Sequence, residues 1–95
     1  MHYRFTRLKH SEENQSRVIA YLESVTDEID SIDGLLSITL ISVSKTETLG
    51  LSHYESEEKM MNANPVQKKV LAGAAELLSG ASEVENGDVL WEWAR

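Results

Sequence analysis

Apolar and polar residues alternate in short segments of the chain, and this period of two predicts β-strands. A first strand is expected over residues 2–9, where Tyr3 and Phe5 share a face. A second is expected over residues 35–45. Its apolar positions change side between residues 40 and 41, so we expect either a β-bulge there or a strand buried on both faces.

Two later segments show the same alternation. LGLSHYE follows a short polar connection and predicts a strand paired with its predecessor in a hairpin. Successive strand side chains point to opposite faces, so His53 and Tyr54 are expected to diverge. VENGDVLWEWA predicts a final strand with Trp91 and Trp93 on one face.

Apolar residues at intervals of three and four predict two helical regions between the strands. Ser11 and Ser56 are expected to cap their first turns, each followed by two glutamates that suit the positive end of a helix dipole. Asn64-Pro65 predicts a restart of the second region, with Asn64 as the cap. The apolar positions are Val18, Leu22, Val25, Ile29 and Ile32 in the first region and Val66, Val70, Leu71, Ala74, Ala75, Leu77 and Leu78 in the second.

The resulting order, β-α-β-β-α-β, predicts an α+β, ferredoxin-like domain over residues 1–95, with a four-stranded antiparallel sheet and both helical regions on one face. The second strand is apolar on both sides, and the outer strands carry aromatic residues at alternate positions. The sheet face turned away from the helices therefore also needs a cover. We expect a homodimer that packs through this open face.

Composition narrows the class of protein. A net charge of −7 opposes a phosphate backbone, so nucleic acid is not an expected partner. The chain has no cysteine, which rules out disulfides, thiolate metal sites and cysteine nucleophiles. No apolar run approaches the roughly 20 residues of a membrane span, and no signal peptide is visible, so we expect a soluble, cytoplasmic protein without a membrane partner.

The element order, the HYESEEKM junction, the NANPVQKKV restart and the closing VLWEWA segment together resemble the antibiotic-biosynthesis monooxygenase family of dimeric α/β barrels. The resemblance spans nearly the whole chain. Tyr54-Glu55-Ser56 is similar to the family's junction between the third strand and the second helical region, and Asn64-Pro65 is similar to its helix restart. These marks consist mainly of caps and strand ends, so they indicate the fold more than the reaction.

The resemblance implies a homodimer with two sheets face to face and a cavity between sheet and helices in each subunit. Some family members oxidise phenols or quinols with molecular oxygen and no cofactor, while others degrade haem. The haem degraders use an asparagine on the first strand, a tryptophan in the second helical region and a haem-binding histidine shortly after it. These positions would align with Thr6, Met61 and Leu71, so this chain has none of the three residues. The resemblance therefore favours the branch that needs neither metal nor flavin.

His53 is the candidate for proton chemistry, because an imidazole titrates near neutral pH. The alternative is a strand-end histidine that is hydrogen-bonded or solvated. Tyr54 is the second catalytic candidate, and Tyr3 is a candidate for substrate binding, since a phenol hydroxyl can donate to a phenolate. For both tyrosines, the alternative is simple packing with a wet hydroxyl.

The other candidates for substrate binding lie near the helix restart and at the end of the chain. Met60, Met61 and Asn62 combine adaptable thioethers with an amide. Trp91 and Trp93 could clamp an aromatic ring, although a tryptophan pair at this spacing is also typical of a core or a dimer interface. No histidine pair has the spacing of metal ligands, so no metal site is expected.

The leading hypothesis is a small dimer resembling cofactor-independent monooxygenases, with a small aromatic phenol or quinol as its ligand. The rival hypothesis is a non-catalytic dimer that binds a small hydrophobic molecule or is purely structural. An isomerase or lyase on the same fold is a third possibility, because it would need only a general acid and a general base.

Overall fold

Four strands form one antiparallel sheet in the computed structural model, which describes all residues from Met1 to Arg95. The strands lie side by side in the order β2-β3-β1-β4. This is the strand order of a ferredoxin-like fold, and it confirms the predicted fold class. The strands are β1 (His2–Lys9), β2 (Leu35–Ser44), β3 (Glu47–Tyr54) and β4 (Glu83–Asp88).

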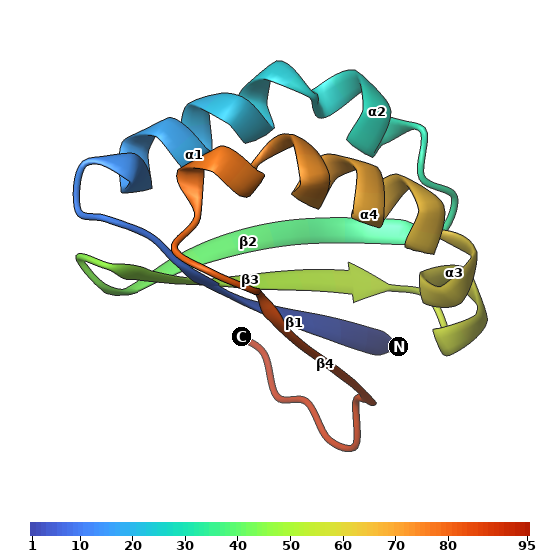
Figure 1. The fold of residues 1–95 in the computed structure, drawn as a ribbon. Helices are drawn as coiled ribbons and strands as arrows, with labels where there is room; N and C mark the ends of the chain where they lie inside the picture. Colours follow the sequence, from blue (N-terminus) through green and yellow to red (C-terminus); the bar gives the residue numbers. More distant parts are fainter.

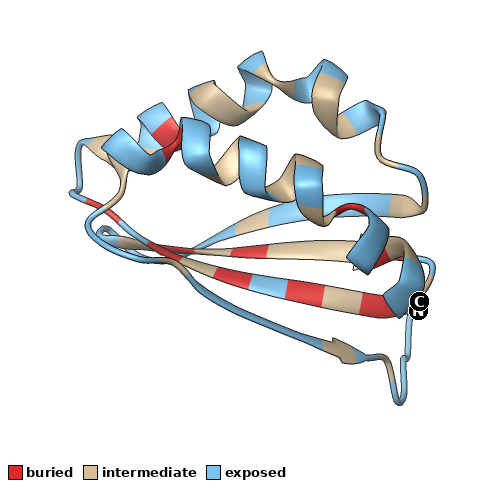
Figure 2. Ribbon diagram, turned by 45° about the vertical axis from the view of Figure 1, so that its right-hand side comes forward, coloured by how far each residue is buried: buried red, intermediate tan, exposed pale blue.

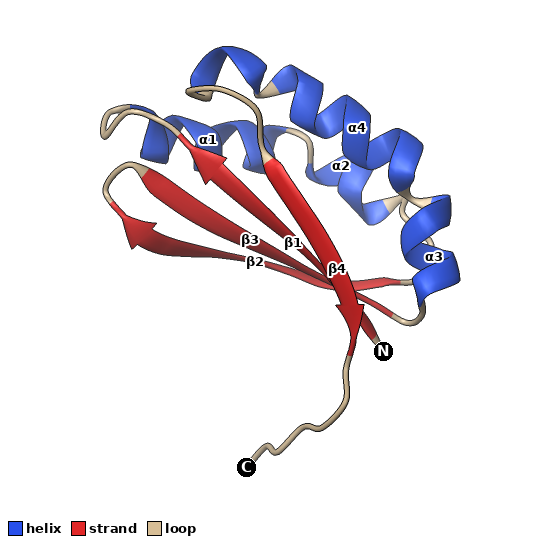
Figure 3. Cartoon of the chain, turned by 60° about the horizontal axis from the view of Figure 1, so that its bottom comes forward, coloured by secondary structure: helices blue, strands red, loops and turns tan.

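The helices cover one face of this sheet (Figures 1 and 3). They are α1 (Asn14–Ser24), α2 (Thr26–Asp30), α3 (Glu57–Asn62) and α4 (Asn64–Gly73), followed by one 3-10 turn at Ala75–Leu77. A hydrogen bond of 2.7 Å from the Tyr21 hydroxyl to the Val70 carbonyl ties α1 to α4. No helix has the length and apolar character needed to span a bilayer.

Strand β1 is an inner strand of the sheet, and buried residues alternate along it with less buried ones (Figure 2). Its even-numbered residues are buried beneath the helices, and its odd-numbered residues are half-buried or exposed. The buried set includes three polar side chains beside one leucine: His2, Arg4, Thr6 and Leu8. Polar groups in this position need partners, and those partners define the sites described below.

The other face of the sheet has no helix over it. Tyr3 and Phe5 of β1 lie opposite His53 and Leu51 of β3 on this open face. Ile41 of β2 continues the apolar surface beside β3, because it pairs with Leu49. Ile41 and Phe5 are 42% and 37% exposed, so the open face leaves large apolar side chains without a cover.

Two strand predictions differ from the structure. The irregularities in the β2–β3 pairing lie between Leu35 and Ser37 and between Ser42 and Ser44, not near residues 40 and 41. The last strand ends at Asp88, so residues 89–95 form an irregular tail instead of continuing the strand. The pairing of β4 with β1 ends at Asp88 and His2, and beyond it the Val89 amide still donates to the Met1 carbonyl at 3.0 Å.

The predicted helix caps are partly wrong. Ser56 caps α3 as expected, because its hydroxyl accepts a hydrogen bond from the Lys59 amide at 3.2 Å. Ser11 does not cap α1, whose first turn begins after Glu13 without a side-chain cap. Asn64 does not cap α4 either: that helix follows Ala63, and the Asn64 side chain binds Arg4 of β1 instead.

Candidate functional site

A cavity of about 90 Å³ lies between the sheet and the helices. Side chains from β1, β2 and β3 form its floor, and side chains from α1, α2, α4 and the segment after α2 form its roof. Most of the lining is aliphatic; Thr6, Ser52 and Gln67 are polar, and Tyr54 is the one aromatic member. The remaining lining residues are Leu8, Leu22, Ile29, Ile32, Ile38, Leu40, Val70 and Leu71.

Tyr54 is the single titratable residue in this lining. It comes from the end of β3, is 2% exposed, and packs against Met60 and Ala63 in the main buried cluster. Burial raises the pKa of the Tyr54 phenol, although the charge of Arg4 and a hydrogen bond from Ser52 act in the opposite direction. The phenol is therefore neutral at physiological pH and keeps the hydrogen that it can donate to an acceptor.

The guanidinium of Arg4 lies over the Tyr54 ring, 5.6 Å from its centroid. Its Nη2 donates to the Met60 carbonyl at 3.1 Å and to the Asn64 side-chain oxygen. Nη1 is buried without a hydrogen-bond partner. Arg4 thus joins β1 to the break between α3 and α4, and it holds a positive charge behind the cavity wall that Tyr54 forms.

His53 lies on the opposite side of the sheet from Tyr54, as the strand alternation predicts. Its imidazole stacks on the Tyr3 ring, with 4.3 Å between the ring centroids and an angle of 4° between the planes. The His53 Nε2 atom is buried and has no hydrogen-bond partner within the chain. The two predicted catalytic residues, His53 and Tyr54, therefore do not share a pocket.

The residues near the helix restart also separate. Met60 points into the buried cluster with Tyr54, whereas Met61 is 56% exposed and Asn62 is exposed. Trp91 and Trp93 lie on the irregular tail and are 80% and 64% exposed. Trp91 and its tail neighbours line a groove of about 540 Å³ beside Tyr3 and Phe5, on the open face of the sheet.

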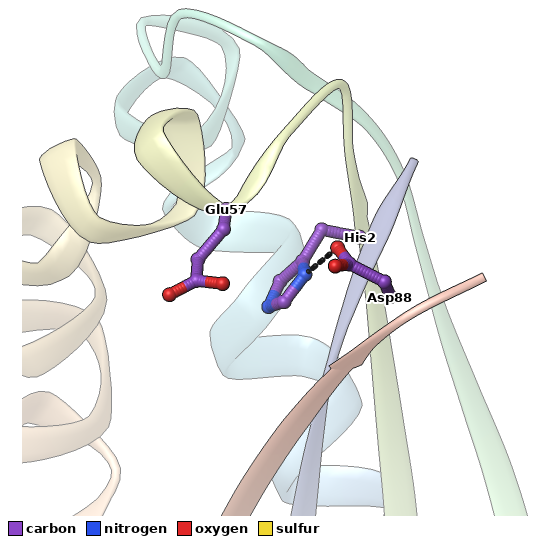
Figure 4. Close-up of side chains that lie close together, drawn as sticks. All are labelled: His2, Glu57 and Asp88. Carbon is purple, nitrogen blue, oxygen red and sulfur yellow. Dashed lines mark hydrogen bonds and ion pairs between the residues drawn. The ribbon is translucent and has the colours of Figure 1, made fainter. Parts of the chain in front are cut away.

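A second polar cluster lies at the end of the sheet where β1 begins (Figure 4). The His2 ring is 2% exposed, and its Nδ1 lies 2.6 Å from Oδ1 of Asp88 in β4. Its Nε2 lies 3.0 Å from Oδ1 of Asn86. Glu57, from the first turn of α3, approaches the ring from the other side.

These contacts raise the pKa of the His2 imidazole. The hydrogen bond to Asp88 is the largest cause, burial opposes it, and Asn86 and the charge of Glu57 reinforce it. Because the side chains come from β1, α3 and β4, no spacing in the sequence brings them together. Sequence reasoning missed this cluster and Arg4; the one available signal was the period of two in β1, which assigns His2 and Arg4 to the same face as Leu8.

No protein-family model matches the chain, and a search of curated proteins finds no matching relative. Solved structures do match. A monooxygenase from ActVA-Orf6 of Streptomyces coelicolor, bound to nanaomycin D, superposes with a TM-score of 0.83 at 16% identity and covers 99% of this chain and 91% of its own. A dimeric ferredoxin-like protein from an uncultured marine organism has a TM-score of 0.81 at 15% identity, with the same coverages of 99% and 91%.

A protein of Caulobacter crescentus, provisionally assigned as an antibiotic biosynthesis monooxygenase, has a TM-score of 0.76 at 15% identity and covers 95% of this chain and 90% of its own. Full-length superposition at such low identity shows a shared fold. The resemblance drawn from the sequence is therefore confirmed at the level of the fold, with monooxygenase-like proteins among the neighbours.

Proposed function

We propose that the cavity beneath the helices binds a small phenol or quinol and promotes its direct oxidation by molecular oxygen, without a metal or flavin. The proposal rests on the position of Tyr54, which is the single titratable group in an otherwise largely aliphatic lining. Its neutral hydroxyl can donate a hydrogen bond to the oxygen of a bound phenolate. Such a bond stabilises the electron-rich anion that reacts with oxygen.

The reaction balances without an external reductant. A phenol with a free para carbon and one O₂ give a para-quinone and one water. One oxygen atom forms the new carbonyl at the para carbon, and the other leaves as water with the para hydrogen and the phenolic hydrogen. A hydroquinone instead passes its two hydroxyl hydrogens and two electrons to O₂, giving the para-quinone and hydrogen peroxide. In both reactions the ring supplies all the electrons, so the contribution of the protein is to position the ring, exclude water and stabilise the phenolate.

The size of the cavity limits the ligand. An apolar cavity of about 150 Å³ can hold benzene. A cavity of about 90 Å³ must widen slightly to admit one ring, and it is far too small for several fused rings. Met60 is a suitable side chain to yield, because it packs on Tyr54 and a thioether chain readily changes rotamer. The expected ligands are therefore single-ring phenols and hydroquinones.

We also propose that a second copy of the chain covers the open face of the sheet. The exposed apolar side chains of Phe5 and Ile41 on this face support this, since a second copy would remove them from water. The exposed Trp91 and Trp93 lie on the tail that borders the same face, and burial in an interface would account for both. In this arrangement, Tyr3 and His53 act at the interface and Tyr54 acts in the cavity.

Oxygen uptake with a panel of single-ring phenols and hydroquinones tests the catalytic proposal. Tyr54→Phe removes one hydroxyl from the cavity, and we expect turnover to fall by about a hundredfold, as for other lost donors to a developing oxyanion. Tyr21→Phe is the matched control, because its hydroxyl bonds the Val70 carbonyl and its loss should leave turnover near the parent value. His53→Ala separates the two faces: loss of turnover in this variant, with Tyr54→Phe unaffected, would place the chemistry on the open face.

One observation favours a non-catalytic binding function as the second candidate. The cavity lining contains no carboxylate, histidine or lysine that could act as a general base. A binding protein would be stabilised by the same phenols without consuming them. Thermal unfolding with each ligand, followed by NMR of the recovered ligand, distinguishes the two functions. A rise in melting temperature with intact ligand and no oxygen uptake would overturn the oxidation proposal.

A further inference from the structure

The geometry points to a divalent-cation site formed by His2, Glu57 and Asp88, at the end of the sheet and separate from the cavity. One donor atom from each residue lies within 4.8 Å of the donor atoms of the other two. The three residues come from β1, α3 and β4, so the site exists only in the folded chain. The expectation of no metal site rested on the spacing of histidines along the sequence, which does not describe this cluster.

The distance between His2 and Asp88 is close to that of two ligands of one ion. Donors at about 2.1 Å from a shared cation lie about 3.0 Å apart in adjacent octahedral positions and about 3.4 Å apart in a tetrahedron. Nδ1 and Oδ1 are 2.6 Å apart, with a hydrogen between them. An outward shift of a few tenths of an ångström would let a cation take the place of that hydrogen.

Asn86 orients the imidazole for this role. Its side-chain oxygen lies 3.0 Å from Nε2, and as an acceptor it holds the proton on that nitrogen. A cation would displace the hydrogen that Nδ1 shares with Asp88, and the Nδ1 lone pair and the Asp88 carboxylate would then face the same ion. Metal-binding histidines commonly donate their second ring nitrogen to a carbonyl or carboxylate, which fixes both tautomer and ring orientation.

The surroundings suit an ion that arrives from solvent. The His2 ring is buried, whereas the Asp88 side chain is 67% exposed and Glu57 is exposed. A cation can therefore reach the ring from solvent past the two carboxylates. Glu57 is exposed in the first turn of α3 and lies beside the ring. The net charge of −7 also attracts cations.

The donor set indicates the class of metal. One imidazole nitrogen and two carboxylates suit borderline ions such as Zn²⁺, Mn²⁺, Co²⁺ and Fe²⁺, whereas Mg²⁺ and Ca²⁺ prefer oxygen ligands alone. Three protein ligands leave further positions for water. The proposal does not depend on Tyr54 or on oxygen chemistry, so either proposal can fail without the other.

The test is calorimetric titration of the untagged chain with ZnCl₂, with no phenol present. We expect one Zn²⁺ per chain, and affinity at least about tenfold weaker in Glu57→Gln and Asp88→Asn. Glu58→Gln is the matched control, because it removes an equal charge from the next position of the same helix turn, and it should bind as the parent does. Both glutamates are exposed, so neither substitution threatens the fold.

Paramagnetic broadening by MnCl₂ in the NMR spectrum locates the ion independently. The proposal predicts that the His2 ring signals broaden first, before those of His10 and His53. It is overturned if no Zn²⁺ binds below millimolar concentration, if Glu57→Gln and Glu58→Gln weaken binding equally, or if the broadening centres on another histidine. Equal weakening would indicate diffuse attraction to an acidic surface instead of a site.

Discussion

The His53 ring lies parallel to the Tyr3 ring, 4.3 Å away between centroids, on the face of the sheet that no helix covers. A stacked pair at this separation contributes about 0.5 to 1.5 kcal/mol beyond its buried area. The pair lies beside Phe5 and Leu51, and together these side chains form the part of the open face that a second copy would cover.

Removing this patch should weaken self-association. We expect His53→Ala and Tyr3→Ala each to raise the dimer dissociation constant by about tenfold, equivalent to about 1.4 kcal/mol. Sedimentation velocity over a concentration series measures the shift. Lys68→Ala, on the exposed side of α4, is the control and should leave association unchanged. If the parent chain sediments as a monomer at micromolar concentration, the proposed dimer is wrong.

The Tyr54 phenol should ionise at a higher pH than a free tyrosine does. Its pKa is raised above the ordinary value of 10.0, so the unfolded chain loses this proton before the folded chain does. The contribution of Tyr54 to stability is complete below pH 10 and declines as the pH rises through the folded-state pKa. Absorbance titration at alkaline pH should show one delayed phenol that is absent in Tyr54→Phe.

The same variant isolates the effect on stability. Urea unfolding at pH 8 and above pH 10 should show a steeper alkaline decline in the parent than in Tyr54→Phe, because only the parent has a buried phenol to deprotonate. Equal declines in the two proteins would mean that the Tyr54 hydroxyl ionises as freely as an exposed one.

Arg4 and Asn64 should behave as one coupled pair. Arg4→Ala leaves a cavity and removes the donor for the Met60 carbonyl and the Asn64 side chain, so we expect a loss of about 2 to 4 kcal/mol in the free energy of unfolding. Asn64→Ala should cost less. The double variant should be about 1 kcal/mol more stable than the sum of the single losses predicts, in urea unfolding at neutral pH. Additive losses would show that the contact between Arg4 and Asn64 contributes nothing to the free energy of unfolding.

Gly34 should tolerate no side chain. Its φ is +81°, and a Cβ there would meet the aliphatic part of Lys59, whose amino group pairs with Asp33. Gly34→Ala should therefore lower the free energy of unfolding by about 1 to 2 kcal/mol or more. Gly87→Ala is the control, since a Cβ at that position meets no atom within 4 Å. Similar losses in both variants would rule out the backbone explanation.

Periodicity was sufficient for the layers of this fold. The period of two placed His53 and Tyr54 on opposite faces, and the helical period identified the segments that cover one of them. The predicted helix cap at Asn64 was wrong because its side chain accepts a hydrogen bond from the buried Arg4 guanidinium. Capping rules consider only neighbouring residues, so they cannot predict a contact with Arg4, which lies 60 residues earlier in the chain.

The candidate site was less predictable for the same reason. Tyr54 was named from the sequence, but the aliphatic walls around it come from five elements, and His2, Glu57 and Asp88 meet only after β4 joins the sheet. The tail was mispredicted because alternation in VLWEWA describes side-chain pattern alone. Whether such a segment becomes a strand depends on a neighbour with free backbone groups, and β1 begins opposite Asp88, so Met1 alone continues the pairing.

Strand β2 makes the chain prone to aggregation while it folds. It lies at one edge of the sheet, contains no charged residue from Leu35 to Ser44, and leaves Leu36, Ile38, Ile41 and Val43 each at least 40% exposed. Such a segment pairs readily with copies of itself when its own partner is absent. We expect the β2–β3 hairpin to form early in folding, because delay at that step would divert chains into aggregates.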